Sequence, residues 1–309
     1  MPWTEADLPD RTGRRAVVTG ANSGLGFETA RALAQHGASV TLAVRSVPRG
    51  RDAADRVRAL APSAIVTVEE LDLADLGSVR AFAQRWTAAN PDGLHLLVNN
   101  AGVMAIPRRQ TADGFEMQLG TNHLGHFALT GLLLAALAAV PEARVVTVSS
   151  AAHRFGRMDF DDLMGTRRYS AWRAYGQSKL ANLLFTSELQ RRLQRAGLPI
   201  KAMAAHPGYA ATNLQGVAPS MRGSSIGERV TEWGNRLLAQ PASMGALPTL
   251  YAATVPNLPG DTFVGPDGWL GQRGHPRVVG RSRAARSRAD AERLWRVSEG
   301  LTGVHPLRE

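Results

Sequence analysis

The sequence has no cysteine, and only two of its 36 basic residues are lysine. Without cysteine the chain cannot form disulfides, thiolate metal sites or a cysteine nucleophile, and this composition fits a reducing compartment. Aromatic residues are also scarce, at 6%, whereas hydrophobic residues make up 44% of the 309 residues. The chain is therefore long enough and apolar enough to form a globular protein with a substantial core.

Long hydrophobic runs are absent too. The longest apolar run covers 127–140, and it falls short of the roughly 18 to 20 residues that span a bilayer. It therefore predicts a buried core helix. The segment 1–15 lacks the apolar core of a signal peptide. We expect a cytoplasmic protein without a membrane anchor.

The chain carries a formal charge of +10, which raises the question of nucleic-acid binding. Its arginines are scattered except in 271–296, which lies within an Arg-rich C-terminal extension, 271–309. Such a segment can contact phosphates or form a solvated surface, and the solvated surface is the favoured interpretation. Because no helix-turn-helix, zinc-finger or RNA-binding signature accompanies it, we expect no specific nucleic-acid partner.

Short β-rich segments alternate with longer helical segments along the first two thirds of the chain. Near-continuous apolar strands separated by helices predict a parallel sheet with helices on both faces, and ligands then bind at the carboxyl ends of the strands. We expect a single α/β domain over 1–309, a Rossmann-type, doubly wound fold. The expected strands are 15–20, 38–45, 64–73, 94–102, 144–150 and 200–208.

Beyond residue 208 the alternation weakens. Residues 209–240 mix glycine, proline and serine, and a long irregular insertion of this kind is more often functional than packed. We expect it to be a substrate loop that forms a lid after the sixth strand. Its apolar side chains favour a lipophilic substrate, although lids also use such residues for packing: Val217, Met221, Ile226 and Trp233. A helix over 241–254, a short strand near 261–266 and a last helix over 288–301 are expected to follow.

The segment after the first expected strand reads VVTGANSGLGFETA, with Gly20, Gly24 and Gly26 between that strand and the first helix. Glycine lets the backbone turn tightly and lets a pyrophosphate approach closely. The helix that follows offers free N–H groups and the positive end of its dipole. Many strand-to-helix turns are rich in glycine merely in order to turn, and the spacing differs from the G-x-G-x-x-G fingerprint. The turn therefore indicates dinucleotide binding in combination with further motifs.

Tyr175 and Lys179 lie four residues apart in a segment with a helical pattern, and Lys179 is one of the two lysines. Residues four apart share a helix face, with Cβ atoms about 5 to 6 Å apart. A nearby cation favours the phenolate and lowers the tyrosine pKa from its ordinary value of about 10. The pair is thus suited to proton transfer. Tyr175 alone could also be a packing residue, and Tyr169, which has Arg173 four residues later, is interpreted as a surface residue.

Several segments, taken in order, resemble those of the short-chain dehydrogenase/reductase family. TGANSGLG (19–26) is similar to its T-G-x-x-x-G-x-G turn, LDLAD (71–75) to its adenine-contacting Asp-Leu, and NNAG (99–102) to its fourth-strand signature. HPGYAATNL (206–214) is similar to its Pro-Gly segment. The resemblance covers roughly 13–302 and is strongest to the retinol-dehydrogenase-like branch.

The resemblance implies four catalytic residues: Asn122, Ser150, Tyr175 and Lys179. Tyr175 is expected to be the general acid in reduction and the general base in oxidation. Lys179 would lower the pKa of Tyr175 and bind the nicotinamide ribose, Ser150 would donate to the substrate oxygen, and Asn122 would position a water in a proton relay. Ser149 is the alternative to Ser150, and a cap or kink in a helix is the alternative role for Asn122.

The resemblance also implies the residues that contact the dinucleotide. They are Gly20, Asn22, Ser23, Gly24, Leu25, Gly26, Arg45, Asp72, Leu73, Asn99, Ala101, Gly102, Tyr175, Lys179, Pro207, Gly208 and Thr212. Arg45 stands directly after the second expected strand, where an acidic residue would hold a ribose 2′-hydroxyl and an arginine suits a 2′-phosphate. We therefore expect NADP, with NAD as the alternative and Arg45 as one more exposed arginine in that case.

The leading hypothesis is an NADP-dependent oxidoreductase that transfers hydride between the nicotinamide and a carbonyl or alcohol substrate. The predicted substrate is a medium-to-large lipophilic carbonyl compound. The alternative is a dinucleotide-sensing regulator that uses the same fold without catalysis. We expect no metal, because His123, His126 and His153 have no metal-ligand spacing. The family commonly pairs through two long helices, placed here near 110–140 and 170–196, so a homodimer or homotetramer is expected.

Overall fold

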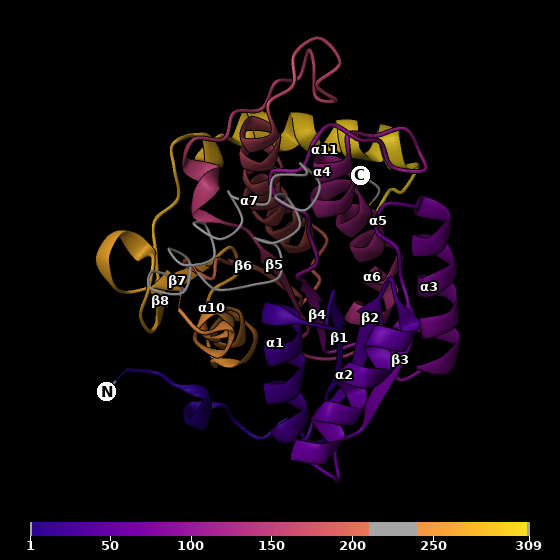
Figure 1. Ribbon diagram of the computed structural model, residues 1–309. Helices are drawn as coiled ribbons and strands as arrows, with labels where there is room; N and C mark the ends of the chain where they lie inside the picture. Colours follow the sequence, from indigo (N-terminus) through magenta and orange to yellow (C-terminus); the bar gives the residue numbers. More distant parts are fainter. Residues whose placement is uncertain (1, 210–239, 308–309) are drawn as a thin grey trace, which may run out of the picture.

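The computed structural model describes residues 2–209 and 240–307, and over these residues the chain forms one mixed sheet between two layers of helices (Figure 1). The sheet has eight strands in the order β3-β2-β1-β4-β5-β6-β7-β8, and all neighbouring pairs are parallel except β7 with β8. The strands are β1 Arg15–Thr19, β2 Ser39–Val44, β3 Val66–Glu70, β4 Leu96–Asn99, β5 Arg144–Val148, β6 Lys201–Ala205, β7 Phe263–Pro266 and β8 Pro276–Val278. This confirms the doubly wound α/β fold.

The strands form because their apolar residues are buried on both faces of the sheet. In β1, Val17 faces one hydrophobic core, whereas Ala16 and Val18 face the other, as the alternation of side chains along a strand requires. The same division holds in β5, where Val145 faces the first core and Val146 the second. Each face therefore needs a layer of helices to cover it.

The helices divide between the two faces. On one face lie α1 Gly24–Gln35, α2 Val47–Leu60 and α10 Ala242–Thr254; on the other lie α3 Leu76–Ala89, α5 Gly125–Leu132 and α7 Ala171–Arg195 (Figure 1). Short 3₁₀ helices occur at Glu5–Asp7, Ala151–Arg154, Trp269–Gly271 and Ala284–Arg286. Because every parallel connection passes over a face, the loops that follow the strands meet at one edge of the sheet.

The segment expected as one long helix near 110–140 is broken. It consists of α4 Met117–Leu119, a π-helix over Gly120–Leu124, α5, and α6 Leu134–Ala138. Most of the apolar run 127–140 is buried, with Ala135 and Ala139 exposed, and it forms most of α5 and all of α6; a buried segment is therefore confirmed, as two helices rather than one. A π-turn frees backbone groups from the regular ladder, and this one falls at Asn122.

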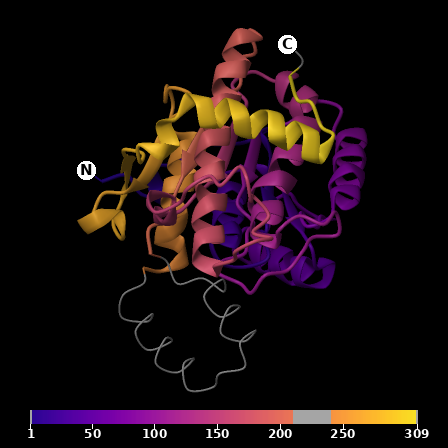
Figure 2. The same cartoon turned by 90° about the horizontal axis from the view of Figure 1, so that it is seen from above.

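The C-terminal segment packs on the fold and presents a solvated arginine surface, as expected: within 271–296 every arginine except Arg281 is exposed. Strand β8 was not predicted, and Arg281 next to it is buried, with an ion pair to Asp261 at 2.6 Å. Helix α11, Arg288–Thr302, crosses α7 and α5 (Figure 2), and the ring of Trp295 lies 5.0 Å from that of Phe127. The expected homodimer or homotetramer, paired through the helices near 110–140 and 170–196, stays a prediction. Within one chain, α11 covers the face of α5 and α7 that bears Phe127.

The insertion expected over 209–240 lies almost wholly outside the described residues, and so does Thr212. Its two flanking residues are joined, because the backbone N–H of Gln240 donates to the carbonyl of Tyr209 at 2.9 Å. The Gln240 side chain also donates to the carbonyl of Pro207 at 2.8 Å. The insertion thus starts and ends beside Pro207. Within the described ranges, no helix is both long and apolar enough to cross a bilayer.

Candidate active site

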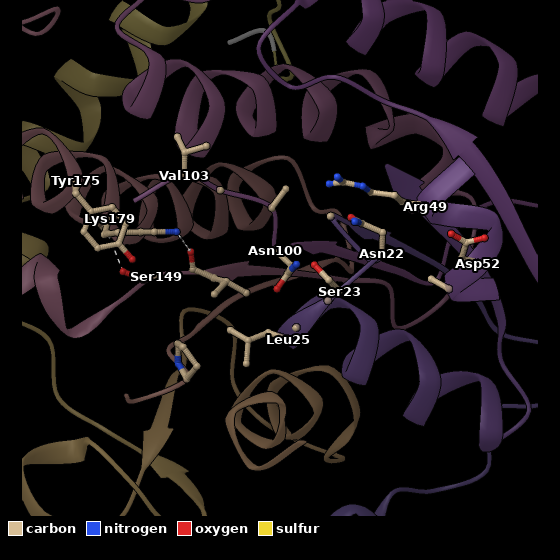
Figure 3. Close-up of a pocket in the computed structure, with 18 of the residues that line it drawn as sticks. Asn22, Ser23, Leu25, Arg49, Asp52, Asn100, Val103, Ser149, Tyr175 and Lys179 are labelled. Atoms are coloured by element: carbon tan, nitrogen blue, oxygen red, sulfur yellow. Dashed lines mark hydrogen bonds between the residues drawn. The ribbon is translucent and has the colours of Figure 1, made fainter. Parts of the chain in front are cut away.

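A cavity of about 660 Å³ opens at the carboxyl ends of β1, β4 and β5 (Figure 3). Its inner end is formed by Tyr175 and Lys179 from α7, and its outer end by Arg49 and Asp52 from α2, beside Asn22 of the turn after β1. The described residues that line it are Gly20, Asn22, Ser23, Gly24, Leu25, Gly26, Arg49, Asp52, Ala53, Arg56, Asn100, Ala101, Gly102, Val103, Val148, Ser149, Tyr175, Lys179 and Pro207.

The turn after β1 has no room for a side chain at Gly20 or Gly26. Gly20 has a φ of 64°, in the left-handed region that favours glycine, and a Cβ there would lie 3.0 Å from Ala101. A Cβ on Gly26 would lie 2.5 Å from the carbonyl of Gly20 and from the side chain of Asn100. The side chain of Ser23, the N-cap of α1, makes no cap hydrogen bond within the described residues. The first N–H groups of α1 are thus available to a phosphate, and the turn fits a dinucleotide.

Tyr175 and Lys179 share one face of α7, as their spacing predicts. Both side chains are buried, with 6% and 5% of their surface exposed. The Nζ atom of Lys179 donates to the carbonyl of Val148 at 3.1 Å and lies 5.8 Å from the centroid of the Tyr175 ring. The carbonyl at the end of β5 therefore holds the ammonium group beside the phenol and at the wall of the cavity.

Burial changes the pKa of both groups. It raises the pKa of Tyr175, and the hydrogen bond with Ser150 only partly offsets this effect. It lowers the pKa of Lys179 to about 8. We expected the pKa of Tyr175 to lie below its ordinary value; in the protein alone it lies above that value, because burial of the phenol outweighs its hydrogen bond with Ser150.

Two adjacent serines follow β5, and their hydroxyl groups are used differently. The Oγ of Ser149 lines the cavity but donates to the backbone carbonyl of Lys179 at 2.7 Å. The Oγ of Ser150 accepts from the N–H of Ala152 at 3.2 Å and is hydrogen-bonded to Tyr175. Ser150 is therefore the serine that reaches the phenol, and Ser149 fixes the backbone of α7.

Asn122 lies in the π-helix and is fully buried. Its amide nitrogen donates to the carbonyl of Val103 and to the Oγ of Ser178, both at 2.9 Å, and its amide oxygen accepts from the N–H of Val103 at 2.8 Å. The side chain thus ties the loop after β4 to α7. A Cβ on Gly102 would lie 2.9 Å from the Oδ1 of Asn122 and 3.5 Å from the Nζ of Lys179, so the loop passes close to both residues.

Several predicted cofactor residues do not line the cavity. Arg45 is exposed after β2, Asp72 accepts from the backbone N–H of Ala74 at 2.9 Å, and Leu73 packs in the core. The amide nitrogen of Asn99 donates to the hydroxyl of Thr130 at 3.0 Å, beneath the cavity floor. Gly208 follows Pro207, with its Cα against the carbonyl of Gln272, and Thr212 lies outside the described residues.

Other cavity residues were missed by the sequence reasoning. Arg49, Asp52 and Arg56 follow each other on one face of α2, and the Cζ of Arg56 lies 4.0 Å above the ring of Phe27. Their spacing of three, four and seven residues was the available signal, since such positions share a helix face. The remaining missed lining residues are Ala53, Asn100, Val103 and Val148, whereas Ser149 had been named only as the alternative to Ser150. Tyr169, expected at the surface, instead donates its hydroxyl to the carbonyl of Ile106 at 2.9 Å.

Comparison with known proteins agrees with this site. The model of the short chain dehydrogenase family matches residues 14–223. Retinol dehydrogenase 12 of Mus musculus is 44% identical over 308 residues, which cover 97% of this chain and 89% of that protein. The crystal structure of an uncharacterized protein from Mycobacterium paratuberculosis is 50% identical, covers 99% of both chains and has a TM-score of 0.81.

A more distant structure, a short chain dehydrogenase from Shigella flexneri complexed with NADP, is 21% identical. It covers 83% of this chain and 97% of its own, with a TM-score of 0.63, and so shows the likeness of fold. Together with the cavity, these findings show that the chain belongs to the short-chain dehydrogenase family, in its retinol-dehydrogenase-like branch. It is an NAD(P)-dependent oxidoreductase that acts on CH–OH and C=O groups.

Proposed function

We propose that the protein interconverts a lipophilic carbonyl compound and its alcohol with NADP, and that Tyr175 is the general acid in reduction and the general base in oxidation. The observation that carries this proposal is that Tyr175 and Lys179 line the same cavity as the glycine turn after β1. A non-catalytic regulator would need the turn alone, so the buried pair at the inner end favours the enzyme.

Each residue at the inner end has a separate role in the proposed reaction. When bound, NADP supplies or accepts the hydride. In reduction the phenol of Tyr175 gives up its proton to the substrate oxygen, and in oxidation it takes up a proton from the substrate hydroxyl. Ser150 orients the phenol oxygen and the substrate oxygen by hydrogen bonding. Lys179, held by the carbonyl of Val148, would reach the ribose hydroxyls, and a positive charge beside the phenol favours loss of its proton. Asn122 holds the loop after β4 in place and would position the relay water.

The outer end supports the choice of NADP. Arg49 lies beside Asn22 (Figure 3), and Arg56 also lines the cavity. A guanidinium group binds a phosphate through a planar pair of N–H donors. Arg45 is exposed at the end of β2 and stays a proposed second contact. Asp52, at the same end, is the residue that would suit the ribose hydroxyl of NAD. The NADP complex of the Shigella relative agrees with the first choice.

The surroundings of Tyr175 support a lipophilic substrate. Trp172 lies one helical turn before it, with ring centroids 6.1 Å apart, and 52% of its surface is exposed. Phe155 is 57% exposed and lies against Gly176, where a Cβ would come within 2.8 Å of the Phe155 ring. Trp172 thus places an open aromatic surface beside the phenol, and Phe155 places a second one on the neighbouring part of α7; such surfaces can pack against an apolar substrate. The retinol dehydrogenases among the relatives agree with this class of substrate.

A panel of aldehydes, ketones and alcohols, assayed by the absorbance of NADPH, tests this proposal. The panel should contain short, long-chain and conjugated members of each class. We expect turnover that rises from the short aldehydes to the long-chain and conjugated compounds. Turnover confined to small polar sugars would contradict the lipophilic substrate, and no turnover of any member with either dinucleotide would contradict the enzymatic proposal.

A further inference from the structure

His126 in α5 is fully buried, yet both of its ring nitrogens are hydrogen-bonded. Its Nδ1 lies 3.0 Å from the backbone carbonyl of Asn122, and its Nε2 lies 2.9 Å from the Oγ1 of Thr19, the last residue of β1. The imidazole therefore bridges the π-helix that holds Asn122 and the strand end that opens into the glycine turn.

The contacts fix which nitrogen carries the proton. A carbonyl oxygen only accepts, so the Nδ1 of His126 must donate to Asn122. The Oγ1 of Thr19 accepts from the backbone N–H groups of Asn100 and Ala101, both at 2.9 Å. Its one hydrogen faces two acceptors, the Nε2 of His126 at 2.9 Å and the carbonyl of Val98 at 3.3 Å, and the shorter contact is the one to His126. Burial lowers the pKa of His126 to about 4, so the ring is neutral at physiological pH, as this pattern requires.

The hydrogen bond from His126 to Thr19 is called the Thr19 arm below, and the one to Asn122 the Asn122 arm. The Thr19 arm leads to residues that line the cavity. Asn100 and Ala101 form its wall, and Gly20, the next residue after Thr19, begins the phosphate turn. The side chain of Asn100 also donates to the backbone carbonyl of Thr19 at 2.8 Å. The position of the imidazole therefore sets how the loop after β4 lies against the turn.

The neighbouring His123, which lies in the π-helix beside Asn122, shows what a purely structural histidine looks like. It is equally buried, but its Nε2 lies 2.9 Å from the Oγ of Ser298 in α11, and its Nδ1 has no partner within the described part of the chain. Its ring packs against Phe127 and Phe185. Within the described residues, its hydrogen bond and its ring contacts all lie between α5, α7 and α11.

We propose that His126 is a positioning residue whose two arms serve different steps: the arm to Thr19 shapes the dinucleotide site, and the arm to Asn122 fixes the catalytic end. Only the part of this inference that concerns the arm to Asn122 rests on the proposed function. The first arm concerns dinucleotide binding, which can be measured without turnover. The two arms can also be removed one at a time, because they leave from opposite sides of the ring.

The test uses the full chain with the substitutions His126→Asn, His126→Gln and His126→Phe, and with His123→Gln as the matched control. An asparagine amide nitrogen can take the place of Nδ1 and keep the Asn122 arm, whereas a glutamine oxygen can take the place of Nε2 and keep the Thr19 arm. Phenylalanine removes both arms. The measurements are the Kd for NADPH by fluorescence titration, kcat at saturating NADPH, and Tm.

We expect His126→Asn to weaken NADPH binding by about tenfold with a smaller change in kcat, because a buried hydrogen bond is lost at the turn. His126→Gln should keep the Kd and lower kcat by about tenfold for the same reason at Asn122. His123→Gln should lower Tm while the Kd and kcat stay at the wild-type values.

The inference would be overturned if the Asn and Gln variants both bound NADPH more weakly and lost kcat to the same extent. It would also be overturned if His123→Gln showed the same changes, because a merely structural role lowers stability without separating the two steps. Wild-type Kd and kcat in both the Asn and the Gln variant would overturn it as well. Failure of the proposed function gives a different result: a wild-type protein without turnover, in which the Kd of His126→Asn still decides the role of the Thr19 arm.

Discussion

The two ends of the cavity are built by opposite means. At the inner end Tyr175 and Lys179 are buried, and burial raises the pKa of the first and lowers that of the second to about 8. At the outer end Arg49, Asp52 and Arg56 are exposed on α2. Interactions of exposed charges are weak and are screened by salt, whereas buried groups depend strongly on each neighbour. Substitutions at the inner end should therefore strongly reduce turnover. Substitutions at the outer end should change the preference for NADP or NAD and leave turnover largely intact.

A large effect is expected at the inner end, where Lys179 can be compared with Lys201, the other lysine of the chain. Lys179→Arg should lower kcat/KM by about a hundredfold or more, because a broad guanidinium does not fit between Val148 and Gly102 and weakens acid–base catalysis. Lys201→Arg makes the same chemical change at the start of β6 and should keep the wild-type value. Equal activity of the two variants would show that the inner end does not depend on its ammonium group.

The next largest effect is expected at the outer end. Arg49→Ala should lower kcat/KM for NADPH by about tenfold, because a charged hydrogen bond to the phosphate is lost, and should leave the value for NADH unchanged. Arg51→Ala, on the same helix but outside the residues that line the cavity, is the control. A loss in Arg45→Ala with none in Arg49→Ala would return the phosphate contact to the residue after β2.

Burial near the inner end also predicts acid sensitivity. Burial lowers the pKa of His123 to about 3 and that of His126 to about 4, whereas an unfolded histidine titrates near 6.5. Below about pH 6.5 the unfolded chain therefore binds more protons than the folded chain, and the free energy of unfolding falls as the pH is lowered towards 4. In His123→Gln this fall should be less steep by up to about 1.4 kcal/mol per pH unit.

Urea unfolding of the wild type and of His123→Gln at pH 7, 6, 5 and 4.5 measures this slope. An identical pH dependence in both proteins would mean that the imidazole is already protonated in the folded state, against its burial beside Phe127 and Phe185.

The smallest effect is expected from the aromatic surface beside the phenol. Trp172→Ala should raise KM for a long-chain aldehyde by about fivefold and leave KM for a short aldehyde unchanged, because only the longer molecule buries apolar surface on the indole. Trp269→Ala is the control, since Trp269 is also exposed, at 84%, and lies in the 3₁₀ helix Trp269–Gly271 rather than on α7. Equal changes for both aldehydes would contradict the role of Trp172 in substrate choice.

The inner end could be predicted from the sequence because its signals are local. The spacing of Tyr175 and Lys179 places them on one face of any α-helix, and the glycines after β1 need no distant contact to make a turn. The strands were found for the same reason: apolar residues buried on both faces, as at Val17 and Val18, give continuous apolar runs.

The parts that were missed depend on packing between distant segments. The π-turn at Asn122 is held by the loop after β4 and by Ser178, and neither contact shows in the pattern of 110–140. Arg281 looks like one more surface arginine until Asp261 is placed beside it. The pKa of Tyr175 was mistaken in direction because helical spacing shows the nearby cation and not the loss of water around the phenol.

The claim that proton transfer occurs at the buried phenol is tested most directly with Tyr175→Phe. Turnover of the best substrate and the Kd for NADPH are measured side by side, with Tyr251→Phe, on α10 against Trp3, as the control. We expect Tyr175→Phe to bind NADPH like the wild type and to lose roughly a thousandfold in kcat, because the acid–base group is gone. A Tyr175→Phe protein that turns over its substrate at the wild-type rate would contradict the account.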